Sequence, residues 1–185
     1  ASISISTPNK IATSSSYLQY QRLKQIAGKR GVSFLYETNV GAGLPVISTL
    51  NDLIISGDRI IKIEGVLSGS LSFIFNSFKE GTTFSSIVKE AKKRGYTEPD
   101  PRVDLNGIDV RRKLIILARE TGLNIEAEEV EINNILPANC QKAKTVEAFF
   151  EEIENANDHF EKIRNEAEAE GKVLRMIAKL DNGKA

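Results

Sequence analysis

Two prolines placed two residues apart near the middle of the chain restrict its fold more than any other feature. Pro99 and Pro101 lie in a polar, acidic stretch over residues 96–107. A helix cannot run through both, because each proline removes a backbone N–H and its ring clashes with the preceding turn. Apolar stripes with helical spacing lie on both sides, and Gly95 ends the first of them. The sequence therefore predicts a loop over 96–107 between two amphipathic helices.

Apolar residues elsewhere recur at spacings typical of either helices or strands. Because the two patterns are mixed along the chain, we predict an α+β fold with a mixed β-sheet covered by helices. The predicted helices run from the Ser-rich cap 13–16 to Gly28 or Gly31, and over about 46–56, 71–78, 84–95, 108–121, 146–153 and 157–172, the last as a solvated surface helix. The predicted strands cover 2–7, 32–36, 59–66, 129–135 and 174–180.

The composition argues against several classes of protein. The chain has 185 residues, 41% of them hydrophobic, which is enough for one sizeable domain core. Its 25 basic and 25 acidic residues balance, which argues against nucleic acid or an anionic membrane as a partner. Cys140 and His159 are the only residues of their kinds, too few for a disulfide framework or a multi-histidine metal centre, and we expect both to be inert. No apolar run approaches the roughly 20 residues of a membrane span, so we predict a cytoplasmic protein.

Four carboxylates lie in the proline-containing loop and in the first turn of the helix that follows it. Glu98, Asp100, Asp104 and Asp109 fall within twelve residues. Such a cluster is solvated, binds a cation, or receives a cationic group of a substrate. The ammonium of a small amino acid would be such a group.

Asp109 and Lys113 are four residues apart on the predicted helix, with the acid first. They therefore share a helix face next to the acidic loop. Spacing alone leaves two interpretations open. The pair is either an exposed ion pair that stabilises the helix by about a few tenths of a kcal/mol, or it makes Lys113 an acid–base group tuned by Asp109.

Two glycine-rich segments join predicted strands to predicted helices. The first, 40–44, does not fit the dinucleotide-binding fingerprint, because the third glycine would fall at Val46. It is either a tight turn or a ligand site in which Glu37 joins backbone carbonyls around a hard cation. The second, 65–70, is either a turn or a set of backbone N–H groups that bind an anion at the start of the next helix.

Four segments have a distinctive order and spacing along nearly the whole chain. They are Thr7-Pro8-Asn9-Lys10, residues 36–45 (YETNVGAGLP), residues 65–71 (GVLSGSL) and residues 95–102 (GYTEPDPR). Together they resemble homoserine dehydrogenase, and residues 35–40 are more similar to the enzymes fused behind an aspartate kinase than to the stand-alone ones. The resemblance implies that residues 1–36 end an incomplete Rossmann-type nicotinamide-binding domain. Residues 37–185 would then form the substrate-binding, catalytic and dimerisation domain.

The resemblance implies an oxidoreductase that interconverts L-aspartate 4-semialdehyde and L-homoserine with NAD(P)H, on the aspartate pathway to threonine and methionine. Lys113 would be the acid–base group, since an ammonium near the aldehyde oxygen stabilises and then protonates the alkoxide that hydride addition creates. Asp109 would serve the same carbonyl. Glu98 would hold the substrate ammonium and Asp104 its polar end. The implied substrate contacts also include Gly95, Tyr96 and Thr97.

The resemblance also implies where cofactors bind. Lys10 would be a second catalytic lysine, at the junction of substrate and cofactor. The nicotinamide cofactor would contact Pro8, Asn9, Lys10, Gly41 and Gly43. A monovalent cation such as Na+ would be bound by Glu37 and the carbonyls of Val40, Ala42 and Leu44.

Two departures limit what the resemblance transfers. Val103 stands where the family commonly has a second acid before Asp104, so the substrate's polar contacts would differ there. The glycine-rich fingerprint of the nicotinamide domain is absent, and we expect it upstream of Ala1, with a returning segment beyond Ala185. We therefore expect the chain by itself to form a homodimer or a higher assembly with little or no activity. In bifunctional relatives an aspartate kinase would lie on the same chain.

The alternative interpretation is a non-catalytic module for dimerisation or amino-acid sensing. Such a module would keep Glu98 and Asp104 to bind an amino acid. Only the enzyme would need Lys113.

Overall fold

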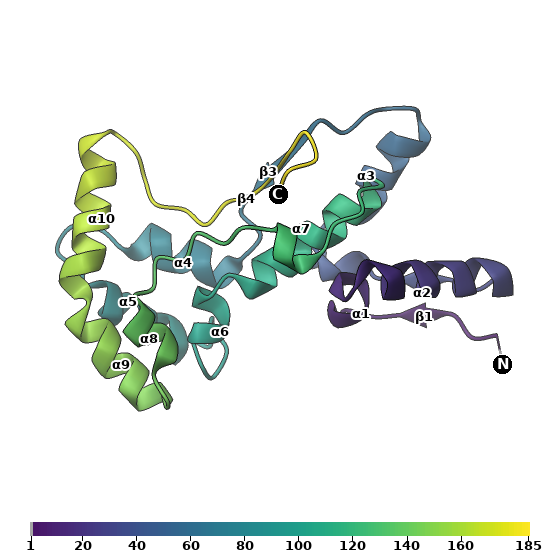
Figure 1. The fold of residues 1–185 in the computed structure, drawn as a ribbon. Helices are drawn as coiled ribbons and strands as arrows, with labels where there is room; N and C mark the ends of the chain where they lie inside the picture. The colour runs from purple at the N-terminus through teal and green to yellow at the C-terminus, as the bar shows by residue number, and fades with distance from the viewer. Residues whose placement is uncertain (1) are drawn as a thin grey trace. The chain divides into compact units, whose positions relative to one another are not determined.

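The computed structural model describes residues 2–185, which divide into two compact units (Figure 1). Unit 1 contains the chain up to residue 67 together with 110–131 and 178–185. Unit 2 contains 68–109 and 132–177. Each unit is therefore assembled from segments far apart in the sequence.

Unit 1 opens with two short strands joined through helices. Strand β1 (Ile5–Ser6) pairs in parallel with β2 (Phe34–Leu35). Between them lie α1 (Ile11–Ser14) and α2 (Tyr17–Arg30). Ser16 caps α2 by accepting a hydrogen bond from the Gln19 backbone N–H, and Gly31 ends the helix at a φ of 60°, which glycine adopts without strain.

The rest of unit 1 consists of helices and an antiparallel strand pair. A 3-10 turn, η1 (Glu37–Asn39), leads to α3 (Val46–Ile55). Strand β3 (Lys62–Gly65) pairs with β4 (Ala178–Asp181), and a short 3-10 turn, η2 (Ala127–Glu129), follows α7 (Ile108–Glu120). The apolar core of this unit consists of Tyr20, Tyr36, Val40, Ile47, Leu50, Ile116 and Leu117.

A buried carboxylate anchors the core of unit 1 to the end of α7. Glu120, with a side chain only 4% exposed, accepts hydrogen bonds from the hydroxyls of Tyr20 and Tyr36 and from Asn51 Nδ2. Lys24 Nζ donates to the Tyr36 hydroxyl at 2.8 Å. Burial, and then the neighbouring Glu120 carboxylate, raise the pKa of both tyrosines. Helices α2, α3 and α7 and Tyr36, the residue directly after β2, therefore meet at one polar cluster.

We expect Tyr36→Phe to lower the free energy of unfolding by about 1 to 3 kcal/mol, because buried Glu120 loses a donor. A tyrosine whose folded pKa lies above its unfolded value near 10 contributes stability that is complete below that value and is lost as the pH rises through the folded pKa. Stability should therefore fall less steeply above pH 10 in Tyr36→Phe than in the wild type. Urea unfolding between pH 8 and pH 11 measures both effects. Tyr17→Phe, which removes a hydroxyl outside this cluster, is the control, and equal slopes would contradict the assignment.

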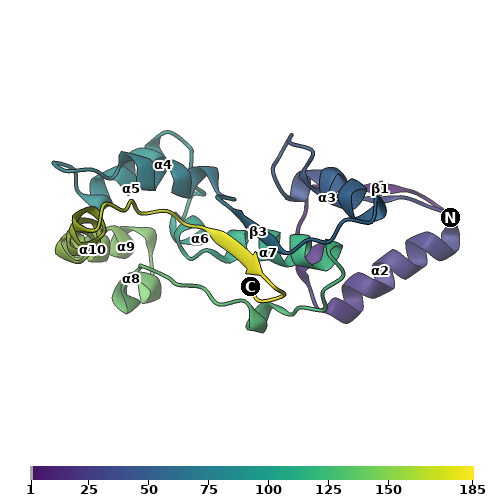
Figure 2. The ribbon, with the colours of Figure 1, turned by 90° about the horizontal axis from the view of Figure 1, so that it is seen from above.

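Unit 2 is a group of helices around stacked aromatic rings. Its helices α4 (Gly69–Ser77), α5 (Phe84–Lys93), α9 (Val146–Asn155) and α10 (Asn157–Ala169) pack together, and Figure 2 shows α9 and α10 beside α5. Two shorter helices, α6 (Arg102–Leu105) and α8 (Ala138–Lys142), complete it. Phe84 is fully buried, with its ring stacked on Phe160 at a centroid distance of 4.1 Å and edge-on to Phe78 at 5.3 Å.

Most of the predicted helices are confirmed, because caps and apolar stripes specify them locally. Ser68, Thr83 and Thr145 each accept the backbone N–H three residues later and begin α4, α5 and α9. In the part of the chain that the structure describes, no helix is long and apolar enough to cross a membrane. The predicted turn after residue 180 is also present, with Asn182 and Gly183 both at positive φ.

Four predictions about the fold are wrong. The described residues form two separate two-stranded ladders, one parallel and one antiparallel, and mostly helices rather than one mixed sheet. The predicted strand 129–135 is irregular from residue 130 on, and Glu129 ends the 3-10 turn η2, which a capping box with Glu126 closes. The predicted loop 96–107 contains α6, which begins directly after Pro101, a position where proline is tolerated. Helix α10 is not fully solvated, since Phe160 and Arg164 on it are buried.

Candidate functional site

Asp104 organises the acidic segment of unit 2. It lies on α6 and accepts the Ser70 hydroxyl at 2.8 Å through one oxygen and the Glu98 backbone N–H at 2.9 Å through the other. Ser70 belongs to the first turn of α4, so one carboxylate connects two segments of the unit. The Glu98 residue itself is exposed. A carboxylate on an exposed residue beside a pre-ordered one suits the recognition of a small polar cation.

A second ion pair holds the same segment in place. Arg102 donates to both oxygens of Asp100, with Nη2 2.6 Å and Nε 2.9 Å from them, and its Nη1 donates to the Ala143 carbonyl. Hydrogen bonds from Arg102 lower the pKa of the Asp100 carboxyl. The loop is ordered by Pro99 and Pro101 together with the paired hydrogen bonds between Arg102 and Asp100. Val103, at the position where an acid was expected, is half exposed.

We expect Arg102→Ala to increase amide hydrogen exchange in residues 96–107 about tenfold, because the charge-assisted bonds to Asp100 and Ala143 are lost. Since the pKa of Asp100 is lowered, the contribution of the pair is present above about pH 4 and is lost as the pH falls further. Exchange read by mass spectrometry at pH 7 checks the variant. Lys162→Ala, which removes an exposed pair with Glu166 on α10, is the control, and equal effects of the two would argue against this role.

The other predicted site residues of unit 2 lie next to this segment. Gly95 has a φ of 71° and ends the turn after α5, which places Tyr96 against the ring of Phe73 at a centroid distance of 4.9 Å. Thr97 is partly buried and donates to the Glu98 carbonyl. The structure therefore brings Gly95, Tyr96, Thr97, Glu98 and Asp104 into one ordered stretch.

Asp109 and Lys113 both lie on α7, in its first and second turns, as predicted. Each is partly buried. Lys113 Nζ donates to the carbonyl of Leu67, just after β3, at 2.7 Å. The lysine is therefore held in unit 1 by a neutral acceptor, which orients its ammonium and leaves its charge uncancelled by that contact.

The segment with Lys10 follows β1 directly in unit 1. The Asn9 backbone N–H donates to Thr7 Oγ1 at 3.1 Å, and Asn9 Oδ1 accepts the Ile11 N–H at 2.8 Å. Pro8 and Asn9 are exposed, and Lys10 is partly buried at the start of α1. Local side-chain bonds thus shape a turn whose exposed face is open to a ligand.

The glycine-rich segment makes a tight turn into α3. Gly41 and Ala42 both have left-handed backbone conformations, with φ values of 80° and 51°. A Cβ on Gly41 would lie 2.5 Å from Val46 Cγ2, so only glycine fits. Glu37 accepts the backbone N–H groups of Ile47 and Ser48, each at 2.8 Å, and so caps α3.

Glu37 and the glycine-rich segment carry donor atoms of the kind that a hard monovalent cation prefers. All the predicted ligand atoms are oxygens: those of the Glu37 carboxylate and of the backbone carbonyls of Val40, Ala42 and Leu44. Each carboxylate oxygen of Glu37 accepts one backbone N–H and has capacity for a further partner. Among residues 2–185 no group of three or more His, Cys, Asp or Glu side chains is arranged to hold a metal ion. A cation here would therefore depend mainly on backbone carbonyls.

We expect Gly41→Ala to destabilise the protein by about 1 to 3 kcal/mol, since the new Cβ meets both a positive φ and a close contact with Val46. Gly43→Ala is the matched control, because its φ is not in the left-handed region and a Cβ there meets nothing within 4 Å. Thermal unfolding of the two variants side by side gives the comparison. A loss of stability that is no larger at Gly41 than at Gly43 would refute the argument.

Sequence reasoning missed the residue that joins these two segments of unit 1. Asn39 and Thr13 are fully buried, and their side chains are hydrogen bonded at 2.8 Å. With its amide turned to satisfy both ends, Asn39 donates to the carbonyls of Thr7 at 3.0 Å and Pro8 at 2.9 Å. In either orientation it ties the glycine-rich segment to the Lys10 segment. The only available signal was a polar residue between the predicted strand 32–36 and the glycine-rich segment, and it does not indicate a partner.

Cys140 and His159, the two residues expected to be inert, both lie in unit 2. Cys140 is buried in α8, and burial raises the pKa of its thiol, so a reactive thiolate is disfavoured. His159 lies on α10 with its Nε2 3.3 Å from the Ile135 carbonyl.

Comparisons with known proteins agree on one family. The model of the family described as homoserine dehydrogenase matches residues 45–184. A homoserine dehydrogenase of Schizosaccharomyces pombe is 48% identical over an alignment of 185 positions, which covers 97% of this chain and 49% of that protein. A bifunctional aspartokinase/homoserine dehydrogenase of Haemophilus influenzae is 46% identical over 178 residues, which are 96% of this chain and 22% of that protein.

Solved structures are similar to this chain as well, including one of a homoserine dehydrogenase. A Candida auris protein of unknown function superposes with a TM-score of 0.90 at 42% identity, covering 98% of this chain and 52% of that one. A hyperthermophilic archaeal homoserine dehydrogenase in complex with NADPH gives a TM-score of 0.69 at 26% identity, covering 98% of this chain and 46% of that one. The chain thus spans about half the length of these structures and of the stand-alone relative, and about a fifth of the bifunctional one. Stand-alone and bifunctional relatives are similar to it to nearly the same degree.

Proposed function

Because the chain belongs to the homoserine dehydrogenase family, we propose that it supplies the substrate-binding and acid–base residues of an enzyme that interconverts L-aspartate 4-semialdehyde and L-homoserine. The observation that carries the proposal is the placement of Lys113, with its ammonium held at 2.7 Å by the Leu67 carbonyl. Residues 1–36 would belong to the nicotinamide-binding domain and 37–185 to the substrate and dimerisation domain. By itself the chain would have little or no activity.

In the proposed reaction Lys113 moves the proton at the substrate's C4 oxygen. During reduction its ammonium stabilises the developing alkoxide and then protonates it, and during oxidation the neutral amine removes the hydroxyl proton. Asp109 lies one turn earlier on the same helix, on the face that also carries Lys113, and would serve the same carbonyl. When bound, NAD(P)H would supply the hydride for the reduction and NAD(P)+ would accept it in the oxidation, as the NADPH complex of the archaeal relative suggests.

The acidic segment would hold the amino-acid end of the substrate. Glu98 would receive the ammonium, because its side chain belongs to an exposed residue on an ordered loop. Asp104 would bind a further polar group while it keeps its bonds to Ser70 and the Glu98 peptide. Gly95, Tyr96 and Thr97 would line the same site. Val103 would leave one polar contact unmade where relatives were expected to have an acid.

The cofactor would bind along the turns of unit 1. Pro8 and Asn9 are exposed, and Lys10 would act where cofactor and substrate meet. Gly41 and Gly43 would allow close approach of the backbone to the cofactor. Na+ or a similar ion would be held by Glu37 and the carbonyls of Val40, Ala42 and Leu44.

We also propose a homodimer or higher assembly in the cytoplasm. The strand pair β3–β4 carries the exposed apolar side chains Ile61 and Val66 at or beside its ends, a surface that a second copy would cover. An aspartate kinase on the same polypeptide is proposed from the bifunctional relative.

We expect Lys113→Ala in the full-length protein to lower kcat for homoserine oxidation by about 100-fold or more, because proton transfer loses its donor and acceptor. The KM for homoserine should change by no more than a few-fold, since Glu98 and Asp104 remain. Steady-state absorbance of the reduced nicotinamide gives both constants. Lys162→Ala, on the exposed face of α10, is the control.

Turnover by Lys113→Ala within a few-fold of the wild type would refute the acid–base assignment. A wild-type protein that binds homoserine in a titration but does not turn it over would instead be an amino-acid-sensing module.

A further inference from the structure

Arg119 is a buried cation on the helix that carries Lys113. Its side chain is fully inaccessible to solvent, and burial lowers its pKa. Burying a guanidinium is unfavourable unless its N–H groups are hydrogen bonded. Such a residue is seldom needed for packing alone, because apolar side chains of similar volume often replace buried ion pairs at no cost in stability.

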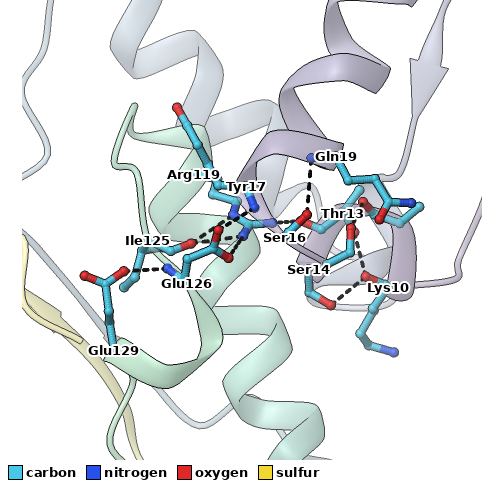
Figure 3. A network of polar contacts seen from close by, with 12 residues as sticks. Lys10, Thr13, Ser14, Ser16, Tyr17, Gln19, Arg119, Ile125, Glu126 and Glu129 are labelled. Carbon is cyan, nitrogen blue, oxygen red and sulfur yellow. Dashed lines mark hydrogen bonds and ion pairs between the residues drawn. The ribbon is translucent and has the colours of Figure 1, made fainter.

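The hydrogen bonds of Arg119 lead to the segment that carries Lys10 (Figure 3). Its Nη1 donates to the Thr13 carbonyl at 2.8 Å, and its Nη2 donates to the Ile125 carbonyl at 2.9 Å and to Glu126 at 3.3 Å. Glu126 in turn accepts the Tyr17 backbone N–H at 2.9 Å. The Arg119–Glu126 pair therefore holds the end of α1 and the start of α2.

Helix α1 depends on this outside support. It has only four residues, and a single helical turn is not stable by itself in water. Its bonds run to the Lys10 carbonyl, which accepts the Ser14 backbone N–H at 2.9 Å and the Ser14 hydroxyl at 2.8 Å. A shift of the Thr13–Ser14 turn would therefore move the backbone of Lys10.

The guanidinium is also confined by aromatic rings. Its carbon lies 5.6 Å from the centroid of Tyr17 and 5.4 Å from that of Tyr20. Tyr20 is itself bonded to Glu120, the next residue of α7. Arg119 thus has little freedom to move relative to its own helix.

We propose that Arg119 is a positioning residue that sets the backbone of Lys10 relative to Lys113. This inference rests on the proposed function, in which both lysines serve the reaction. All the residues involved belong to unit 1. One helix therefore carries the acid–base lysine and, two turns later, the group that fixes the segment of the second lysine.

The test compares Arg119→Met with Arg164→Met in the full-length protein. Arg164 is a matched control because it too is buried, donates to a carbonyl, that of Lys79, at 2.9 Å, and lies over an aromatic ring, that of Phe78. We expect Arg119→Met to lower kcat for homoserine oxidation about 10-fold to 100-fold, with the KM for homoserine within about twofold. Arg164→Met should leave kcat within about twofold. Equal losses of kcat in the two variants would overturn the proposal.

A double-mutant cycle with Lys10→Ala separates positioning from a general structural effect. If Arg119 acts through Lys10, Arg119→Met should lower kcat of the Lys10→Ala enzyme by no more than about twofold. A loss as large as in the wild-type background would overturn the proposal. Should Arg119→Met fail to fold, Arg119→Lys replaces it, since lysine keeps the charge and lacks the planar fork.

Hydrogen exchange in residues 7–16 gives a readout that does not require activity. We expect faster exchange in Arg119→Met and no change there in Arg164→Met. Unchanged exchange in both would overturn the positioning role even if the enzyme is active. A wild-type protein without homoserine dehydrogenase activity would refute the proposed function, while the exchange comparison would still decide whether Arg119 holds the Lys10 segment.

Discussion

Two neighbouring charged residues at the end of α7, Arg119 and Glu120, are buried in unit 1, and much of that unit is built around their hydrogen bonds. Glu120 collects the hydroxyls of Tyr20 and Tyr36 and the amide of Asn51, while Arg119 donates to backbone carbonyls and to Glu126. A charge withdrawn from water is tolerable only when such partners surround it. The two residues therefore require α1, α2, α3 and Tyr36, which follows β2, to meet α7 in one arrangement.

The segments that carry the candidate chemistry are too short to hold their own shape. Helices α1 and α6 have four residues each, and η1 has three. In each case side chains bond to backbone groups of another segment: Asn39 and Arg119 near Lys10, Glu37 at α3, and Asp104 with Arg102 in the acidic loop. Bonds of this kind order a loop without covering it, which leaves its exposed groups available to a ligand.

Similarity to known proteins shows the family of the chain, whereas the contacts in the structure show how its residues are held. The comparisons identify homoserine dehydrogenase, and they include both stand-alone and bifunctional relatives at nearly equal identity. The contacts in the structure show how candidate residues are held, for example Lys113 by Leu67. The roles assigned to those residues are proposals from chemistry and resemblance. The positioning role of Arg119 is argued from its contacts together with the proposed roles of Lys10 and Lys113, and no motif singled this residue out.

The sequence by itself determined the features that depend on near neighbours. Capping residues and apolar stripes specified α2, α4, α5, α7 and α9, and the spacing of four between Asp109 and Lys113 placed both on α7. Only the tertiary structure decided which strands pair, that a helical turn follows Pro101, and that Arg119 reaches the Thr13 carbonyl 106 residues away along the chain. The reason is physical. Capping and periodicity are set within a few residues, whereas strand pairing and buried polar bonds depend on partners that meet only when the chain is folded.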